Sequence, residues 1–73
     1  MSFSMNNIEF PWYSGMTMKD AVNLALQDER LCFLGEHSLM YTQNYKVLNA
    51  GDLARIPVDK GDNIQILVQI SGG

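Results

Sequence analysis

The sequence is poor in cysteine, proline and basic residues, and each shortage excludes a class of protein. Cys32 stands alone, so no internal disulfide can form, although small secreted domains usually depend on several. Five basic residues against eight acidic ones give a net charge of −3, which disfavours binding to nucleic acid or to an anionic membrane. No apolar run approaches the roughly 20 residues that cross a bilayer, and the N-terminus lacks signal-peptide character. We therefore expect a cytoplasmic protein that binds neither nucleic acid nor membrane.

The length and composition predict one small globular domain. A chain of 73 residues is within the size of a single domain, and its 47% hydrophobic content suffices for one core. We find no internal repeat, linker or charge block. Residues 1–73 are therefore expected to form one unit that ends in a flexible Gly-Gly tail at 71–73.

The first thirty residues predict a hairpin followed by a helix. Apolar and polar residues alternate over 3–5 and 8–10, and Asn6-Asn7 between them tolerates the positive φ of a tight turn. Pro11 predicts that the second strand either lies at a sheet edge or is interrupted there. Thr17 and Asp20 resemble a capping box, and from Met18 the apolar residues repeat with a helical period. This helix should end near residues 28–30.

The middle of the chain gives weaker patterns. The apolar run at residues 31–34 has the length of a buried central strand, in which Cys32 would be an inert packed thiol. Residues 36–53 show no clear period, so we expect mostly loop with one short strand at 45–48. Residues 54–58 alternate but include Pro57, which predicts a short edge strand.

The last part of the chain predicts a strand that leads into the tail. Residues 60–63 read as a turn, and Ile64, Ile66, Val68 and Ile70 then alternate as if they faced the helix. Leu67 would point to the opposite face. Leu67 and Ile70 are therefore candidate partner-docking residues, although Leu67 could equally pack beneath the middle segment.

The order of elements predicts an α+β fold. A hairpin, one helix and further strands correspond to the ubiquitin-like β-grasp order, with a mixed sheet packed on one helix. The strand that leaves the helix should lie beside the first strand, through a right-handed crossover.

The C-terminal Ser71-Gly72-Gly73 is the most informative segment for function. Two terminal glycines would occur by chance in roughly 0.5% of chains at average glycine usage. Without Cβ atoms, Gly72 and Gly73 can enter a narrow tunnel and approach a reactive centre. The ionised carboxylate of Gly73 could attack an activated phosphate, and sulfur could then displace the adenylate to give a thiocarboxylate. The alternative is a frayed chain end without chemical use.

Several motifs resemble those of the ThiS/MoaD sulfur carriers, the bacterial relatives of ubiquitin, and are more similar to ThiS of thiamine biosynthesis. They match in order and spacing over about half the chain: Asn6-Asn7, Ser14-Gly15-Met16-Thr17, Lys60-Gly61-Asp62-Asn63-Ile64 and Ile70-Ser71-Gly72-Gly73. The chain departs from the family at Leu34-Gly35-Glu36, where an asparagine-containing turn is expected. The Phe-Pro-Pro run of molybdopterin-synthase small subunits is replaced by Val68-Gln69-Ile70.

The resemblance implies a protein co-substrate rather than an enzyme. Its partners would be a ThiF-like, E1-like adenylyltransferase, which uses ATP and magnesium, and a ThiG-like thiazole synthase. The carrier itself would be a monomer without a bound cofactor. Molybdopterin, an amino acid or a secondary metabolite remains an alternative sulfur acceptor.

The other candidate residues carry weaker signals. No metal-binding spacing, phosphate loop or nucleophile motif occurs in the sequence, which disfavours an independent enzyme. His37 has no partner motif and is expected to be exposed. Trp12 and Tyr13 could form either a partner-binding patch or a cover over the core. A second class of function is thus a non-covalent ubiquitin-like interaction module that binds through the sheet face around Leu67.

Overall fold

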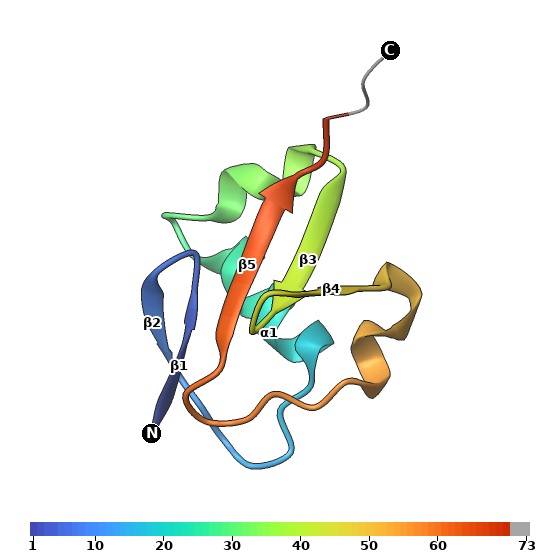
Figure 1. Cartoon of the computed structure of the whole chain (residues 1–73). Coiled ribbons are helices and arrows are strands. Elements are labelled where there is room, and N and C mark those ends of the chain that lie inside the picture. The colour runs from blue at the N-terminus through green and yellow to red at the C-terminus, as the bar shows by residue number, and fades with distance from the viewer. Residues whose placement is uncertain (71–73) are drawn as a thin grey trace.

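The computed structural model describes residues 1–70 and consists of one five-stranded sheet, one α-helix and two short 3₁₀ helices (Figure 1). The strands are β1 (Ser2–Met5), β2 (Ile8–Pro11), β3 (Leu39–Gln43), β4 (Lys46–Leu48) and β5 (Asn63–Val68). The helices are α1 (Met18–Gln27) and the 3₁₀ helices η1 (Cys32–Glu36) and η2 (Ala50–Arg55). The helix α1 lies behind the sheet in the view of Figure 1.

The strand order in the sheet is β2-β1-β5-β3-β4. Strands β1 and β5 are parallel neighbours, and every other pair is antiparallel. The first and last strands thus lie together at the centre, as in a β-grasp fold, and the expected mixed sheet on one helix is confirmed. One detail of the prediction is wrong: the last strand, and not the strand that follows α1, pairs with β1.

The predicted hairpin is confirmed. Asn6 and Asn7 adopt φ values of 51° and 65°, which are the positive values of a two-residue turn that suits the twist of paired strands. Strand β2 ends at Pro11 and lies at the edge of the sheet, where a missing N–H leaves no gap in the ladder.

The predicted capping box at the start of α1 is also confirmed. The backbone N–H of Asp20 donates to Thr17 Oγ1 at 3.3 Å, and the backbone N–H of Thr17 donates to Asp20 Oδ2 at 3.0 Å. The bond from the Thr17 backbone is the largest cause of a lowered pKa at Asp20. One face of the helix is buried against the sheet, through Met18, Ala21, Val22 and Ala25.

The expected central strand at residues 31–34 is wrong. Leu31 instead caps η1 and is buried, and within η1 Leu34 is buried while Cys32 and Phe33 are exposed. A spacing of three residues places Leu31 and Leu34 on one side of a 3₁₀ turn, whereas a strand would place them on opposite faces. Cys32 is consequently exposed rather than packed in a strand.

Residues 36–53 contain more regular structure than the sequence predicts. The short strand expected at 45–48 is present as β4, but β3 is an additional strand where loop was expected. All five residues of β3 are half-buried, so the strand shows no contrast between a buried and an exposed face. Asn44 and Tyr45 connect β3 to β4 with φ values of 51° and 70°.

The edge strand expected at residues 54–58 is also wrong. The 3₁₀ helix η2 occupies the first part of this segment, and Asn49 caps it by accepting a bond from the Gly51 N–H at 2.9 Å. Only an isolated bridge between Thr17 and Pro57 remains of the pairing. The residues on either side of this bridge make its hydrogen bonds, from the Met18 N–H to the Ile56 carbonyl oxygen at 2.8 Å and from the Val58 N–H to the Met16 carbonyl oxygen at 2.9 Å.

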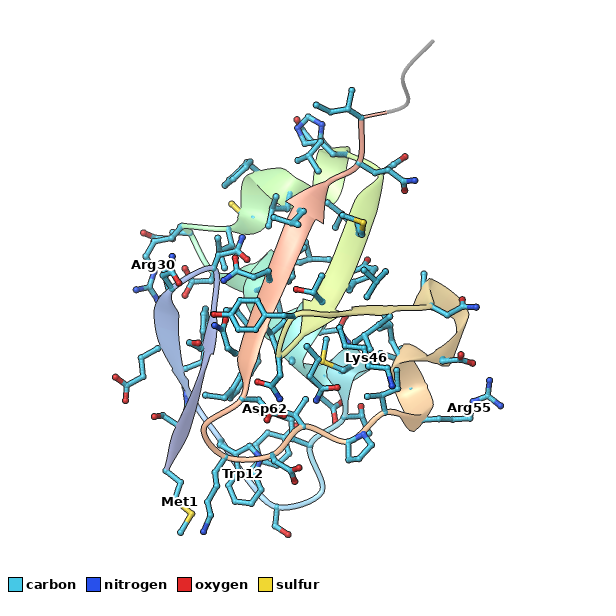
Figure 2. All side chains as sticks on the ribbon, viewed as in Figure 1. Met1, Trp12, Arg30, Lys46, Arg55 and Asp62 are labelled. Atoms are coloured by element: carbon cyan, nitrogen blue, oxygen red, sulfur yellow. The ribbon has the colours of Figure 1, made fainter. Side chains whose placement is uncertain are left out.

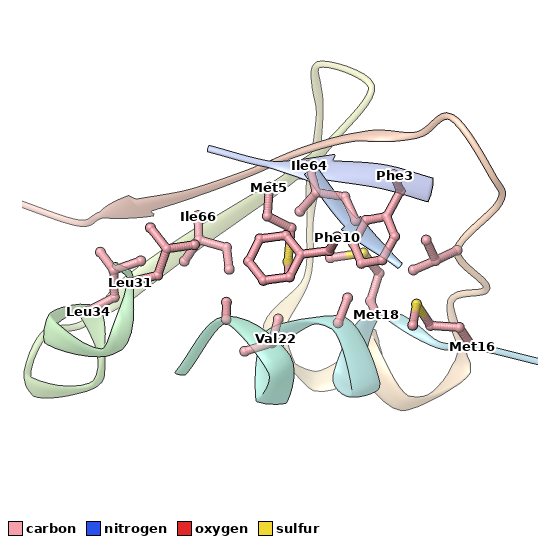
Figure 3. Close-up of a cluster of buried hydrophobic side chains, with 13 residues drawn as sticks. Phe3, Met5, Phe10, Met16, Met18, Val22, Leu31, Leu34, Ile64 and Ile66 are labelled. Atoms are coloured by element: carbon pink, nitrogen blue, oxygen red, sulfur yellow. The ribbon is translucent and has the colours of Figure 1, made fainter. Parts of the chain in front are cut away.

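The core lies between the sheet and α1 (Figure 3). Ile64 and Ile66 of β5 are almost fully buried, as predicted. Val68 and Ile70, which were expected to face the helix as well, are 40% and 88% exposed. Figure 3 shows Ile66, Leu31 and Leu34 at the same end of the buried cluster. The last strand therefore extends beyond the core.

Asp62 fixes the start of β5. Its carboxylate accepts bonds from Gln43 Nε2 and Asn44 Nδ2, both at 2.9 Å, and from the Asp59 N–H at 2.8 Å. Asp62 is buried, and these three donors satisfy it. The bonds join the turn before β5 to the turn between β3 and β4.

Candidate functional site

The candidate site is the C-terminal end of β5, where β5 and β3 extend beyond the other strands of the sheet. Strand β5 pairs with β1 only through Asn63 and Ile64, whereas its pairing with β3 continues to Val68. Strand β3 in turn pairs with β4 only from Tyr41 onward. The far end of the sheet is therefore a ribbon of two strands, and Figure 1 shows this ribbon rising toward the C-terminus.

The described part of the ribbon ends in exposed apolar side chains. The backbone N–H of Gln69 donates to the Ser38 carbonyl oxygen at 2.8 Å, and Ile70 follows with 88% of its surface exposed. The predicted adenylation residue Gly73 and the tail residues Gly72 and Ser71 lie outside the described residues. What the structure describes is the point from which this tail leaves.

Leu67 lies on the open face of the sheet, opposite to α1. Ile64 and Ile66 point to the helix, and alternation along β5 therefore places Leu67 on the other face. Leu67 is 40% exposed and lies opposite Met40 of β3. It is neither buried under the middle segment nor fully open, because β3 flanks it.

The open face carries further apolar residues that the sequence did not single out. Strand register places Thr42 opposite both Gln65 and Val47, so these side chains share the face with Leu67. Val47 is 63% exposed. Tyr45 is 83% exposed, and its hydroxyl accepts a bond at 3.1 Å from Nδ2 of Asn63. We call Met40, Leu67, Val47 and Tyr45 the open-face patch.

Recognising β3 would have revealed this patch from the sequence. The signal is the pair Asn44-Tyr45 between two short runs of strand-forming residues, in which asparagine tolerates the positive φ of a hairpin turn. Tyrosine rarely takes the second position of such a turn, because its Cβ disfavours positive φ. Because Tyr45 stands at this position, the sequence pattern does not indicate a hairpin.

A shallow hollow near the other end of the sheet is polar and acidic. Its volume is about 320 Å³, and it is lined by Ser2, Phe3, Ser4, Asn7, Glu9, Gly61 and Asp62. The lining includes two carboxylates and no basic side chain, which is unfavourable for a phosphate group. The hollow is thus a poor candidate for a nucleotide site.

The basic residues of the described chain do not gather into one surface. Figure 2 shows Arg30 beside the β1–β2 hairpin, while Lys46 and Arg55 lie on the opposite side of the molecule. Arg30 is engaged by Asp28, with Nη2 and Oδ2 at 2.8 Å, and Arg55 by Asp52. The hydrogen bond from the Arg30 side chain lowers the pKa of Asp28 to about 2.

The remaining candidate residues are dispersed. Cys32 is exposed on η1, and its Sγ lies 3.6 Å from the Glu29 carbonyl oxygen. His37 follows η1 and is exposed, as predicted. Trp12 is half-buried and its Nε1 donates to the Val58 carbonyl oxygen at 2.7 Å, which favours a cover over the core, while Tyr13 is 52% exposed.

Within residues 1–70, no group of three or more acidic, histidine or cysteine side chains could hold a metal ion. None of the helices in this part of the chain has the length and apolar character to cross a membrane.

The comparisons with known proteins support the fold. Searches of protein families and of curated proteins found no match. Among solved structures, the chain is similar to the crystal structure of the thiamine biosynthesis protein ThiS from Geobacter metallireducens. The TM-score is 0.69 at 17% sequence identity, and the match covers 100% of both chains. The expected ThiS-like β-grasp fold is therefore confirmed.

Proposed function

We propose that this protein is a sulfur carrier that presents its C-terminal carboxyl group to partner enzymes. The observation that supports this most directly is the exposure of the last described residues, at the end of β5. The last strand runs from the centre of the sheet past the core, so that the exposed Ile70 immediately precedes Ser71-Gly72-Gly73. The three residues that follow Ile70 in the sequence have small side chains or none.

In the proposed cycle, the carboxylate of Gly73 attacks the α-phosphorus of ATP, which is held with magnesium by a ThiF-like adenylyltransferase. Pyrophosphate leaves and an acyl adenylate forms. A persulfide of the sulfur donor attacks the carbonyl carbon, and AMP leaves. A thiol then cleaves the sulfur–sulfur bond and leaves a thiocarboxylate on Gly73. This ATP-dependent cycle belongs in the cytoplasm.

The sulfur acceptor that we favour is the thiazole precursor of thiamine, delivered through a ThiG-like synthase. The fold match to a thiamine biosynthesis protein supports this choice. Molybdopterin, an amino acid or a secondary metabolite would use the same carrier chemistry with another synthase. In each case the protein is a monomeric co-substrate and the partner enzymes carry the catalytic groups.

The open-face patch is the proposed docking surface. Within the patch, Leu67 lies nearest to the tail, and Val47 and Tyr45 extend the apolar area across the sheet. The exposed Ile70 lies outside the patch and is a second proposed docking residue. Apolar residues at the centre of an interface carry much of its binding energy. Docking through this patch would hold the tail near the partner's active site.

Removal of Gly73 tests the carrier function. In the presence of ATP, magnesium and the ThiF-like enzyme of the same organism, the complete chain should support exchange of pyrophosphate into ATP. The chain that ends at Gly72 should bind the enzyme with unchanged affinity but support far slower exchange. If both chains behave alike in exchange and in sulfur transfer, the non-covalent interaction module becomes the better interpretation.

Leu67→Ser tests the docking surface. We expect the KM for the carrier to rise about tenfold, because an apolar contact at an interface centre is lost. Lys60→Ser, at the opposite end of β5, is the control and should leave KM unchanged. An unchanged KM in Leu67→Ser would contradict docking through this face.

A further inference from the structure

The side chain of Asn6 continues the sheet where β1 stops. Strand β1 ends opposite Ile64, and the backbone N–H of Asn6 donates the last main-chain bond, to the Ile64 carbonyl oxygen at 3.0 Å. The chain then turns back into β2. At the next residue of β5 with the same orientation, Asn6 Nδ2 donates to the Ile66 carbonyl oxygen at 3.0 Å, and the Ile66 N–H donates to Asn6 Oδ1 at 2.7 Å.

These two bonds are the pair that a neighbouring strand would make. The residues of β5 alternate in direction: Asn63 and Gln69 bond toward β3, whereas Ile64 and Ile66 bond toward β1. The amide of Asn6 therefore satisfies both main-chain groups of Ile66 on the edge that β1 has left. It does so across a sequence separation of 60 residues, so this contact forms only in the folded chain.

The position of this contact matters because the sheet narrows there. Beyond Ile66 only β3 pairs with β5, and a two-stranded ribbon is only marginally stable by itself. Asn6 holds the base of this ribbon on the edge that β3 does not cover. Any change in the direction of β5 at Ile66 would be amplified along Leu67–Ile70 toward the tail.

The turn alone does not explain the asparagine. Asn6 and Asn7 both take positive φ, a requirement that glycine would also meet. Within residues 1–70 the structure records side-chain hydrogen bonds for Asn6 and none for Asn7. The Asn6 amide donates one of these bonds and accepts the other, whereas glycine has no side chain to do either and an ionised carboxylate can only accept.

We propose that Asn6 is a positioning residue that acts through Ile66 and fixes the direction in which the reactive tail leaves the protein. The inference rests on the proposed function, since it assigns a role in presenting Gly73. Loss of the amide broadens the directions of the ribbon and lowers the fraction of docked complexes with Gly73 in reactive geometry. The docking surface is untouched, so kcat falls and KM stays the same.

The test compares Asn6→Gly with Asn7→Gly. Both substitutions keep a turn that accepts positive φ, but only the first removes the bonds to Ile66. Pyrophosphate exchange with the ThiF-like enzyme gives kcat and KM, at a temperature where Trp12 fluorescence shows each variant folded. We expect kcat to fall on the order of tenfold in Asn6→Gly and to be unchanged in Asn7→Gly. Amide hydrogen exchange should accelerate at Ile66 in Asn6→Gly alone.

A second variant covers the case in which Asn6→Gly does not fold. Asn6→Asp keeps an acceptor for the Ile66 N–H and loses the donor to the Ile66 carbonyl oxygen, so its kcat should fall below that of Asn7→Gly with KM unchanged. Equal kcat in Asn6→Asp and Asn7→Gly would overturn the positioning role. Equal kcat in Asn6→Gly and Asn7→Gly would overturn the positioning role, as would a rise in KM that accounts for the whole loss.

The two proposals fail in different ways. If the unsubstituted chain supports no exchange with the enzyme, the proposed function is contradicted, and the role of Asn6 in presenting Gly73 falls with it. If the unsubstituted chain reacts but Ile66 exchanges equally fast in both glycine variants, the carrier function stands and the role of Asn6 is overturned.

Discussion

At the scale of single residues, short polar contacts decide where each element begins and ends. Thr17 caps α1, Asp62 ties two turns together, and Asp28 receives the Arg30 guanidinium just after the helix ends. The Thr17 and Asp62 side chains accept bonds from backbone N–H groups. The contact of Asp28 with Arg30 joins opposite charges. Two of these contacts lead to stability predictions.

Thr17→Ala should lower the free energy of unfolding by about 1 kcal/mol, because the Asp20 N–H loses its acceptor at the start of α1. Urea denaturation followed by Trp12 fluorescence measures this change. Ser14→Ala, at an exposed position in the same loop, is the control and should change stability by less than about 0.5 kcal/mol. Equal effects of the two substitutions would contradict the capping role.

Asp28 should make stability depend on pH in the acidic range. Its folded pKa of about 2 lies below the ordinary value of 3.8, so the folded protein binds this proton less readily than the unfolded chain. The contribution is complete above about pH 4 and is lost as the pH falls toward 2. Urea midpoints of Asp28→Asn should therefore fall less over this interval than those of the parent.

The control for this pH dependence is Glu29→Gln, which removes the adjacent carboxyl group but keeps the Asp28–Arg30 pair. The urea midpoint of Glu29→Gln should fall between about pH 4 and pH 2 by more than that of Asp28→Asn, because the Asp28 carboxyl group is still present. Identical curves for the parent and Asp28→Asn would show that the ion pair does not contribute in solution.

At the scale of elements, the two halves of β5 have different tasks. The half up to Ile66 is part of the core, and the half from Leu67 onward carries exposed residues toward the tail. The strand thereby connects the most stable part of the molecule to its proposed reactive end. This division can be tested separately from any function.

Ile66→Ala should lower the free energy of unfolding by about 2 to 5 kcal/mol, because it leaves a cavity beneath the sheet. A domain of this size has roughly 4 to 11 kcal/mol in total, so the loss is large. Val68→Ala, two residues later in the same register, should cost less than about 1 kcal/mol, because Val68 is 40% exposed. Equal losses would mean that the core continues beneath the ribbon.

The sequence predicts the elements whose local patterns agree with their burial. The hairpin, α1 and the first half of β5 are correctly predicted, because turn residues, the capping box and alternation all point to the same structure. The strand β3 is missed because its half-buried residues show no alternation. The run at residues 31–34 is misread because apolar residues without a clear period fit a strand as well as a 3₁₀ turn.

The candidate site is predictable only in part, because several of its residues are brought together by tertiary pairing and not by a local sequence pattern. The alternation of β5 correctly places Leu67 on the face opposite to α1, but it would turn Ile70 toward the helix, and Ile70 is instead exposed because the strand extends beyond the core. The neighbours of Leu67 on the open face come from β3 and β4, whose register depends on tertiary pairing. The amide of Asn6 is recognisable in the sequence as a turn residue, but its bonds to Ile66 depend on β1 lying beside β5.

At the scale of the whole molecule, the topology separates recognition from chemistry. The N-terminal and C-terminal strands pair at the centre of the sheet, so the chain end begins from the most interconnected part of the fold. The open-face patch lies beside the same strand and offers a partner an apolar surface. Under the proposed function, the same strand would link the docking surface to the segment that ends in Gly73.

The most direct test of this account is the intact mass of the protein after incubation with ATP, magnesium, a sulfur donor and the ThiF-like enzyme. We expect the mass to increase by the difference between one sulfur and one oxygen atom, with the change confined to a C-terminal peptide that contains Gly73. The chain that ends at Gly72 should keep its mass. An unchanged mass of the chain that ends at Gly73, in a reaction where the same enzyme preparation adds sulfur to a ThiS protein used as a positive control, would contradict the central claim.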